Sequence, residues 1–347
     1  MTKKKKPTVK KLRILVLCQH DLVPPDALPE GVAKETLRWR TEYDVVSTLR
    51  SMGHDVYPVG LYDETDVIRT AMQDHEPHVA FNLIEEFDRQ PMFDQHVVSY
   101  LELKRLPYTG CNPRGLTIAK DKALTKKILA YHRINVPGFG VFPQGRKVRR
   151  PARLRFPLLV KSVTVEGSVG ISQASIVNTD EKLAERVDFI HRQTNSPAIA
   201  EEFIEGREIY VGVIGNRLLK AYTPWELEMK TLPEGTVNIA TGKVKWNPKY
   251  QEKVGLVTHA AEVTPELRRR LEHLSKRIYR LLFLSGYGRL DYRITEDGRI
   301  YLLEANPNPQ IAHNEDFADS AEDCGVKYGP LLQKILTLGM SYEPGVV

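Results

Sequence analysis

The sequence predicts a mixed α/β (α+β) protein, in which a parallel α/β domain at the amino end is followed by α+β structure. Two observations support this fold class. Short β-branched runs alternate with segments of helical periodicity over the first hundred residues, as they do in βαβ units. Near the carboxy end, two alternating runs flank Asp297-Gly298, the strongest short-range signal for an antiparallel hairpin.

The amino-terminal elements follow from periodicity and stop signals. Residues 12–18 form a β-branched run that ends in a proline-containing loop, typical of the first strand of a parallel sheet. Residues 41–52 carry apolar side chains at helical spacing, and Gly53 is a stop signal. Further strands are expected at 54–59 and 79–83, with ligand-binding loops at the carboxyl ends of the strands.

The later elements divide the chain into a tail and three domains. A helix is expected over 117–133, a strand over 156–161 and a long helix over 265–282, just before the hairpin. The expected division is a disordered basic tail at 1–12, an amino-terminal α/β domain at 13–118, a central subdomain at 119–213 and a carboxy-terminal subdomain at 214–347.

Composition indicates a globular enzyme without membrane segments. The net charge of +6 comes from residues 1–13, which hold seven basic side chains and no acid, so the body is close to neutral and nucleic-acid binding is not expected. Three separated cysteines give no disulfide framework, and no apolar run is long enough to span a membrane, so we expect a cytoplasmic protein. The basic stretch 146–155 is left open as an exposed connection, a helix face or a partner contact.

The hairpin places two acids opposite each other. A two-residue loop at Asp297-Gly298 pairs Asp291 with Glu304 and Arg289 with Asn306, which puts like charges across a strand pair. A divalent cation would neutralise them, because carboxylate and amide oxygens are the ligands that Mg²⁺ prefers. A solvated face, screened by arginines, is the alternative. The opposite face would pair Leu290, Tyr292 and Ile294 with Ala305, Leu303 and Tyr301.

The Arg-x-Asp at 289–291 and the Glu-x-Asn at 304–306 resemble the magnesium hairpin of ATP-grasp enzymes, most closely the D-alanine:D-alanine ligase branch. The resemblance extends from about Phe81 to the carboxy terminus and implies an ATP-grasp fold. It implies Asp291, Glu304 and Asn306 as metal ligands, and Arg289 as the catalytic residue that stabilises the acyl phosphate and the tetrahedral intermediate. ATP and Mg²⁺ are the implied cofactors, with two metal ions and Mn²⁺ as a substitute.

Two lysines and a glycine-rich loop match the phosphate-binding parts of this family. Lys161 ends an apolar strand, and glycines in the loop that follows would let backbone N–H groups approach phosphate oxygens. The resemblance implies that Lys161 touches the α and β phosphates and that Lys122 is the second phosphate lysine. Lys126 is interpreted as a solvated helix residue that could serve instead. The loop expected to close on ATP comprises Glu166, Gly167, Ser168, Val169 and Gly170.

Residues 200–208 resemble the adenine hinge of the family, although by themselves they indicate only an acidic strand end. The resemblance implies that the backbone at Glu202 and Ile204 pairs with the base edge. It also implies that Glu201 meets the exocyclic amine, that Glu208 meets the ribose, and that Phe203 and Ile204 flank the ring. Lys249 lies where the family has a lid and is a candidate for the γ-phosphate, with a plain loop as the alternative.

The loops that would select the substrates depart from the D-alanine enzymes. Residues 18–25, 81–89 and 307–316 lack the glycine-rich and serine motifs of those enzymes. We therefore expect an ATP- and Mg²⁺-dependent carboxylate–amine ligase that forms an amide or peptide bond through an acyl phosphate, with a substrate other than plain D-alanine. Acids in these loops favour a cationic or amine-rich substrate or are rim charges: Glu85, Glu86, Glu315 and Asp316.

Several alternatives stay open at this level. The chain could be a D-alanine:D-alanine ligase proper, or a nucleotide-binding regulatory protein of the same fold that no longer ligates, although the intact Arg289 argues against the latter. The acceptor could be a protein or peptide end, with the basic tail as a docking element. The expected partner is a small amino-acid or peptide substrate that supplies a carboxylate and an amine, and a homodimer is compatible with the sequence.

Overall fold

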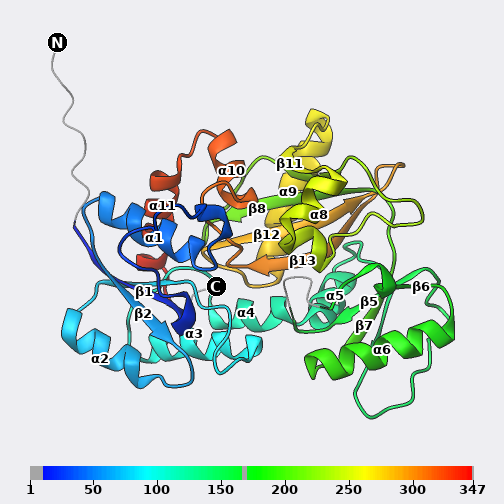
Figure 1. Cartoon of the computed structure of the whole chain (residues 1–347), viewed down its shortest axis with the longest axis horizontal. Coiled ribbons are helices and arrows are strands. Elements are labelled where there is room, and N and C mark those ends of the chain that lie inside the picture. The colour runs from blue at the N-terminus through cyan, green and yellow to red at the C-terminus, as the bar shows by residue number, and fades with distance from the viewer. Residues whose placement is uncertain (1–10, 166–169, 346–347) are drawn as a thin grey trace. The chain divides into compact units, whose positions relative to one another are not determined.

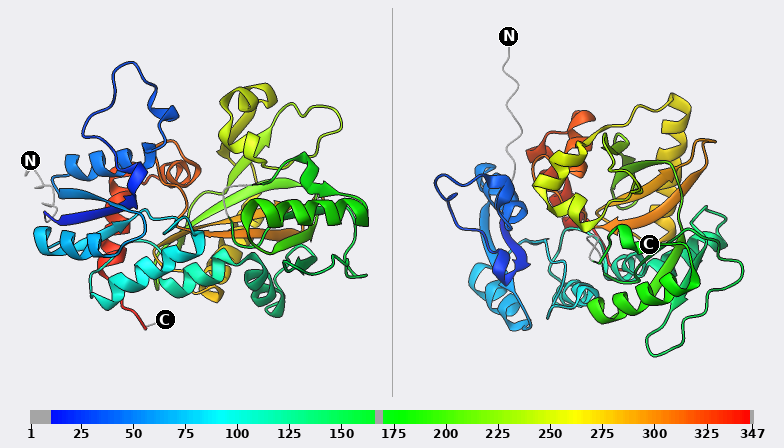
Figure 2. Two further views of the ribbon diagram at one scale, coloured as in Figure 1. Left: turned by 60° about the horizontal axis from the view of Figure 1, so that its bottom comes forward. Right: turned by 45° about the vertical axis from the view of Figure 1, so that its right-hand side comes forward.

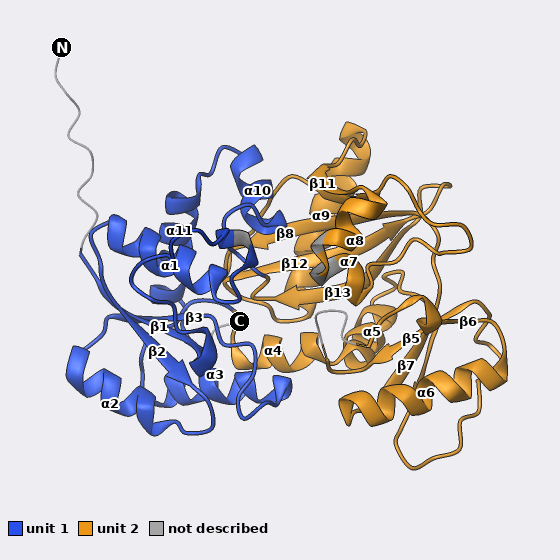
Figure 3. Ribbon diagram, viewed as in Figure 1, with its two compact units in different colours: residues 1–110, 310–347 blue, residues 111–309 orange. Residues whose placement is uncertain are grey.

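The computed structural model describes residues 11–165 and 170–345, which fall into two compact units (Figures 1 and 3). Unit 1 comprises Met1–Gly110 and Gln310–Val347, and unit 2 comprises Cys111–Pro309. The three domain boundaries expected from the sequence stay a prediction. Among the described residues, no helix combines the length and the apolar character that crossing a membrane requires.

Unit 1 contains a parallel sheet in the order β2-β1-β3. The central strand β1 (Arg13–Gln19) is buried and pairs in register with β2 (Asp55–Leu61) and β3 (Val79–Asn82), so the three predicted strands are confirmed to within two residues. The chain passes from β1 to β2 on one side and then to β3 on the other side of β1. The strand order therefore reverses between β1 and β3, at the carboxyl ends of these two strands. Ligands of open α/β sheets bind at such a point.

The helices of unit 1 come from both ends of the chain. Helix α1 (Arg40–Ser51), predicted at 41–52, packs against the sheet and against α11 (Tyr328–Met340). A Cβ atom on Gly339 would lie 2.4 Å from the carbonyl oxygen of Tyr108, so only glycine allows α11 to approach this segment so closely. The remaining helices are α2 (Asp66–His75), α3 (Asp94–Leu103), α10 (Asp316–Asp323) and the 3₁₀ turns His20–Leu22, Lys34–Thr36 and Pro91–Phe93.

Unit 2 begins with two short helices and a four-stranded antiparallel sheet. The single helix predicted at 117–133 is wrong, because Asp121 adopts an extended conformation and its side chain caps the second helix by accepting from Leu124 N at 2.8 Å. The sheet has the order β4-β7-β5-β6, and Figure 2 shows α6 alongside it. These elements are α4 (Pro113–Lys120), α5 (Lys122–Tyr131), β4 (Phe139–Phe142), β5 (Leu158–Ser162), the 3₁₀ turn Gln173–Ser175, β6 (Ile176–Val177), α6 (Asp180–Thr194) and β7 (Ala198–Glu202).

A second antiparallel sheet in unit 2 has the order β11-β10-β8-β12-β13, with β9 paired to β8. Helix α9 (Pro265–Leu281) confirms the long helix predicted at 265–282; it packs on β8 and starts at the Thr264 cap with proline in its first turn. Residues 146–155 contain no helix and form a connection. The other elements are β8 (Arg207–Ile214), β9 (Lys220–Ala221), β10 (Trp225–Met229), α7 (Gly242–Trp246), α8 (Pro248–Val254), β11 (Leu256–Ala260), β12 (Tyr287–Ile294) and β13 (Ile300–Pro307).

Candidate active site

The hairpin β12–β13 pairs Asp291 with Glu304 and Arg289 with Asn306, as predicted. The predicted two-residue loop is nevertheless wrong. Thr295 N donates to Arg299 O and Gly298 N donates to Thr295 O, with Gly298 at a φ of 77°. Residues 296–298 therefore form a three-residue loop, the common type that places glycine in the left-handed conformation.

The longer loop shifts the pairing near the turn by one residue. Tyr292 lies opposite Leu302, and Ile294 lies opposite Ile300, so the predicted partners Leu303 and Tyr301 are wrong. A β-bulge between the Asp291 and Tyr292 pairs restores the register, with Leu303 as the extra residue. The two deviations cancel, which is why the acids face each other as the simpler hairpin predicted.

The bulge turns two consecutive side chains to one face of the sheet. Leu302 and Ala305 are buried, whereas Leu303 and Glu304 between them are partly exposed and both line the same cavity. The carbonyl oxygen of Leu303 accepts a hydrogen bond from Lys126 Nζ at 2.7 Å. The bulge thus fixes an apolar side chain directly beside an acidic one.

Each acid of the hairpin is neutralised by a cation within unit 2. Asp291 accepts two hydrogen bonds from Arg289, at 2.8 and 2.9 Å, and one from Asn306 Nδ2 at 2.9 Å. Glu304 Oε1 accepts from Lys161 Nζ at 2.8 Å. The alternative considered above was that Arg289 and Arg293 screen the two acids. Arg289 does pair with Asp291, but Arg293 pairs with Glu208 instead of Glu304.

The donor set fits magnesium better than a transition metal. Among the described residues, no three His, Cys, Asp or Glu side chains converge as a metal cluster, and the hairpin offers two carboxylates and the Asn306 amide. Magnesium is commonly held by one or two protein carboxylates, and phosphate oxygens and water complete its shell. The predicted ligands Asp291, Glu304 and Asn306 therefore fit that ion.

Two buried lysines flank a buried glutamate behind the hairpin. Glu201 Oε1 lies 3.3 Å from Lys126 Nζ and 3.4 Å from Lys161 Nζ. Burial alone would lower the pKa of Lys161, but the carboxylates of Glu201 and Glu304 outweigh it and raise that pKa above its ordinary value. Burial, with the neighbouring charge of Lys161, lowers the pKa of Lys126.

The interpretation of Lys126 as a solvated residue is wrong, since only 1% of it is exposed. It lies one helical turn after Lys122, on the same face of α5, and this spacing was the signal that it belongs to the site. Lys122 is also buried, donates to Val165 O at 3.0 Å and has Nζ 4.0 Å from Glu304 Oε1.

The end of β7 carries an acceptor and a donor without hydrogen-bond partners. Glu201 Oε1 is within ion-pair distance of the two lysines but accepts no hydrogen bond within the described structure. The N–H of Ile204 likewise has no partner among the described residues. The N–H of Glu202 donates to Gly138 O at 2.7 Å and is not available to a ligand. A planar ligand with a donor edge beside an acceptor would complement the Glu201 carboxylate and the Ile204 N–H.

Glu208 is held by residues that the sequence did not point to. It accepts from Arg293 Nη2 at 2.6 Å and from Tyr210 Oη at 2.7 Å. Arg293 also donates to the carbonyl oxygens of Gly206 and Asn238, at 2.7 and 2.6 Å, and only 4% of it is exposed. Arg293 lies two residues after Asp291, on the same face of β12, so strand alternation could have revealed it.

A cavity of about 80 Å³ brings together eight of the predicted residues. It is smaller than a typical nucleotide site because the cations and acids that line it, Lys161 and Glu304 above all, contact each other directly. Arg293 and Leu303 also line it, although the sequence indicated Arg293 only as a screening charge and Leu303 as a residue of the core face. The predicted lining residues are Lys161, Glu201, Glu202, Phe203, Ile204, Glu208, Asp291 and Glu304.

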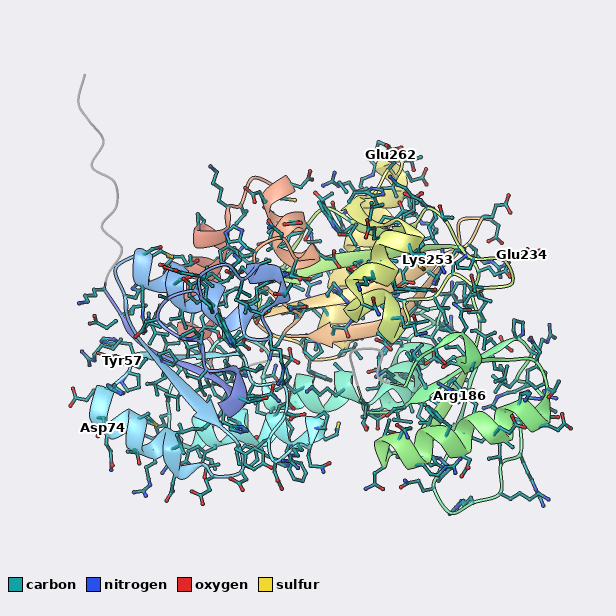
Figure 4. All side chains as sticks on the ribbon, in the orientation of Figure 1. Tyr57, Asp74, Arg186, Glu234, Lys253 and Glu262 are labelled. Atoms are coloured by element: carbon teal, nitrogen blue, oxygen red, sulfur yellow. The ribbon has the colours of Figure 1, made fainter. Side chains whose placement is uncertain are left out.

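The remaining predicted residues lie around this cavity or apart from it. Arg289 and Asn306 do not line the cavity, but both donate hydrogen bonds to Asp291, which does. Gly170 has a φ of 72°. Its carbonyl oxygen accepts a hydrogen bond from the Arg186 side chain of α6, and Arg186 is labelled in Figure 4. The residues Glu166, Gly167, Ser168 and Val169 lie outside the described residues. Lys249 lies on helix α8, so the alternative of a plain loop is wrong. Its side chain is exposed and does not line the cavity.

The family model for the D-ala D-ala ligase C-terminus matches residues 128–337, which is more than half of the chain. The chain belongs to this family. It is an ATP- and Mg²⁺-dependent, ADP-forming ligase of carbon–nitrogen bonds, as the resemblance implied.

Individual relatives agree with this membership. D-alanine--D-alanine ligase of Desulforudis audaxviator is 29% identical over 314 residues, which cover 88% of this chain and 94% of that protein. The uncharacterized protein y4sG of Sinorhizobium fredii is 27% identical over 322 residues, covering 90% and 89%. The crystal structure of D-alanine--D-alanine ligase from Bacillus anthracis complexed with ATP has a TM-score of 0.73 at 22% identity, covering 95% of this chain and 97% of that one. The predicted ATP-grasp fold is confirmed.

Proposed function

We propose that this ligase joins a carboxylate to an amine through an acyl phosphate, and that its substrates are not two molecules of plain D-alanine. The observation that carries the catalytic part is the hairpin, where Arg289, Asp291, Glu304 and Asn306 lie together at one face of the sheet and Lys161 contacts Glu304. A protein that only bound nucleotide would have no use for an arginine fixed beside the metal ligands.

The proposed roles follow from charge and chemistry. Asp291, Glu304 and Asn306 would hold magnesium, which would supply positive charge to neutralise the charge that develops on the phosphates of ATP. Lys122 and Lys161 hold the phosphates. Arg289 meets the negative charge of the acyl phosphate and of the tetrahedral intermediate, an interaction that typically contributes about 3–4 kcal/mol to lowering a barrier.

The base would occupy the end of β7. Glu201 Oε1 is the acceptor for an exocyclic amine, and the N–H of Ile204 is the donor for a ring nitrogen. At Glu202 the base would meet the carbonyl oxygen, since the N–H is taken by Gly138. Phe203 and Leu303 supply apolar contact, and Glu208 receives the ribose hydroxyls. Glu208 retains acceptor capacity, because each carboxylate oxygen can accept more than one hydrogen bond.

Binding of magnesium and ATP would exchange ion pairs. Lys161 now neutralises Glu304, and Arg289 neutralises Asp291, at 2.8 Å in each case. When the cation takes the carboxylates, the lysine and the arginine become available for phosphate and acyl phosphate. The exchange leaves no buried charge uncompensated before or after binding, and an uncompensated buried charge would cost several kcal/mol.

The substrate part of the proposal rests on unit 1. Asp21 and Glu85 follow β1 and β3, at the sheet edge where ligands of this architecture bind. Glu42 of α1 is 95% buried there and its Oε2 has no hydrogen-bond partner within the described structure. Burial, with the charges of Glu85 and Asp21, raises the pKa of Glu42 from 4.5 to about 7. An ammonium group would satisfy the unpartnered carboxylate of Glu42, so a substrate with a cationic side chain or an additional amine is favoured.

Not every acid in these loops contributes to that preference. Glu315 forms an ion pair with Arg40, Asp44 is paired with Lys34 at 2.8 Å, and Asp21 is paired with Arg38 at 2.9 Å. Their charges are neutralised within unit 1.

The test is a screen of ADP release by the purified protein with ATP, Mg²⁺ and single or paired amines. Lysine, ornithine, diamines and short basic peptides are compared with D-alanine, D-serine and neutral peptides. The proposal expects ADP release that depends on a cationic amine and a product whose mass equals the two substrates less water. ATP binding without ADP release under every substrate condition would instead favour a regulatory nucleotide-binding protein.

A further inference from the structure

A second concavity lies on unit 2, beside α9. It measures about 480 Å³ and is bounded by α9, by residues 133–135 after α5 and by the start of β13. Five arginines line it, Arg133, Arg269, Arg270, Arg277 and Arg299. His273 lies among them, and Glu266 is the single acid of the lining. We call it the arginine groove, and it shares no lining residue with the nucleotide cavity.

Four of these guanidinium groups have no acidic partner among the described residues. Arg270 and Arg277 touch only backbone carbonyl oxygens, at 3.5 and 2.9 Å. Arg133 and Arg269 form no side-chain hydrogen bond or ion pair within the described chain. Arg299 is the exception, since it pairs with Asp297 at 2.7 Å.

On α9, the arginines that line the groove lack the acidic partners that an arginine on another face of the same helix has. Arg268, on another face of the helix, has an acidic partner four residues later, Glu272, at 3.1 Å. Arg269, His273 and Arg277 instead follow each other at intervals of four residues and form one basic stripe. A fold that only needed solubility would gain by alternating the signs.

We propose that the arginine groove binds a small ligand that carries several phosphate groups. Guanidinium forks match phosphate oxygens in bidentate geometry and keep their charge at any physiological pH. Four unpaired guanidinium groups exceed what a single carboxylate or a single phosphate neutralises, so a chain of phosphates fits the charge better. From Arg269 to Arg277 the stripe is roughly 12 Å long at 1.5 Å per helical residue, longer than one phosphate group.

The size of the groove separates a small ligand from a nucleic acid. A volume of about 480 Å³ lies within the range of small-molecule sites, roughly 300–1,000 Å³. A nucleic acid needs a basic surface that continues beyond one concavity, together with aromatic groups for stacking if the strand is single. His273 is the only aromatic side chain in the lining of this groove.

The experiment measures binding of inorganic tripolyphosphate to the full chain by equilibrium dialysis, with the nucleotide cavity saturated by ADP and excess Mg²⁺. The expected result is saturable binding of one equivalent that weakens as salt is raised. Arg269→Gln/Arg270→Gln/Arg277→Gln is expected to weaken binding by at least about tenfold, since each charge-assisted contact typically contributes more than 1 kcal/mol. The corresponding lysine triple variant keeps the charge but loses the fork, and an intermediate affinity is expected.

The matched control is Arg146→Gln/Lys147→Gln/Arg149→Gln, which removes three positive charges from exposed residues of the other basic segment. It should bind like the wild type. Equal loss in both glutamine variants would reduce the effect to net charge and overturn the proposal, as would no binding to the wild type. GTP as a second probe distinguishes the sources: tighter binding than tripolyphosphate assigns a nucleoside polyphosphate, and equal binding assigns the phosphate chain alone. If only a single-stranded RNA binds and the groove variant loses it, the small-ligand proposal is wrong.

Discussion

Replacing Glu42 by glutamine is expected to stabilise unit 1 above neutral pH. Glu42 is 95% buried, its Oε2 has no hydrogen-bond partner within the described structure, and no cation is paired with it there. Burial raises its pKa from 4.5 to about 7, which means that the folded state holds a proton that the unfolded chain releases at lower pH. Glutamine has the same shape as the protonated side chain and does not ionise.

The pH dependence follows from this sign. A raised folded-state pKa contributes stability that is fully present below pH 4.5 and is lost as pH rises through about 7. One pKa unit corresponds to about 1.36 kcal/mol, so this group costs the wild type up to about 3 kcal/mol at pH 8 relative to pH 4. Glu42→Gln should therefore match the wild type at pH 4 and exceed it by up to about 3 kcal/mol at pH 8.

Hydrogen exchange of the α1 peptides resolves this effect, because it reports on unit 1 alone in a chain of two units. Exchange is measured from pH 4 to pH 8, after correction for the intrinsic rate. Glu226→Gln, an acid of unit 2 that is paired with Arg207, serves as the control and should leave α1 unchanged. A Glu42→Gln variant that exchanges faster than the wild type at pH 8, or by a pH-independent factor, would refute the reasoning.

Three further outcomes are expected. Glu304→Gln should abolish magnesium-dependent ADP release and leave the fold intact, since one metal carboxylate is removed; near-native turnover at ordinary magnesium would contradict the metal assignment. Lys126→Met should lower the free energy of unfolding of unit 2 by about 3 kcal/mol in chemical denaturation, because it leaves the charge of Glu201 less compensated, whereas Lys127→Met, at an exposed neighbour, should change little. Deletion of residues 1–11 should leave ligation of a small substrate unchanged, because the body is nearly neutral without them; loss of ATP turnover would show that the tail belongs to the catalytic unit.

The parts of the site that the sequence predicted are those fixed by local pattern. Strand alternation determines that Asp291 and Arg289 share a face, and a strand that ends in Lys161 is visible as an apolar run. The facing pair of Asp291 and Glu304 was also predicted, although two local errors, the loop length and the bulge at Leu303, cancelled. Nothing in the sequence distinguishes that bulge from regular pairing.

The parts that the sequence missed depend on tertiary contacts. The spacing of Lys126 from Lys122 placed it on the same helix face, but only the fold shows that it lies beside Glu201 and the Leu303 carbonyl oxygen. Strand alternation places Arg293 on the face of Asp291, but its partner Glu208 is supplied by the neighbouring strand β8, which the sequence alone does not align. The break at Asp121 was missed because a single aspartate is compatible with a helix interior as well as with a cap.

The central claim is that a ligase with the nucleotide site of this family acts on a substrate other than plain D-alanine. The most direct measurement is incubation of the purified protein with ATP, Mg²⁺ and D-alanine alone, followed by detection of ADP and of the dipeptide by mass. A site built for a different ligand leaves buried polar groups unpaired when the wrong one enters, at about 1–3 kcal/mol per group, so two or three mismatches suppress turnover by orders of magnitude. We expect ATP and Mg²⁺ to bind and D-alanine to give little or no ADP. Robust formation of D-alanyl-D-alanine would contradict the claim.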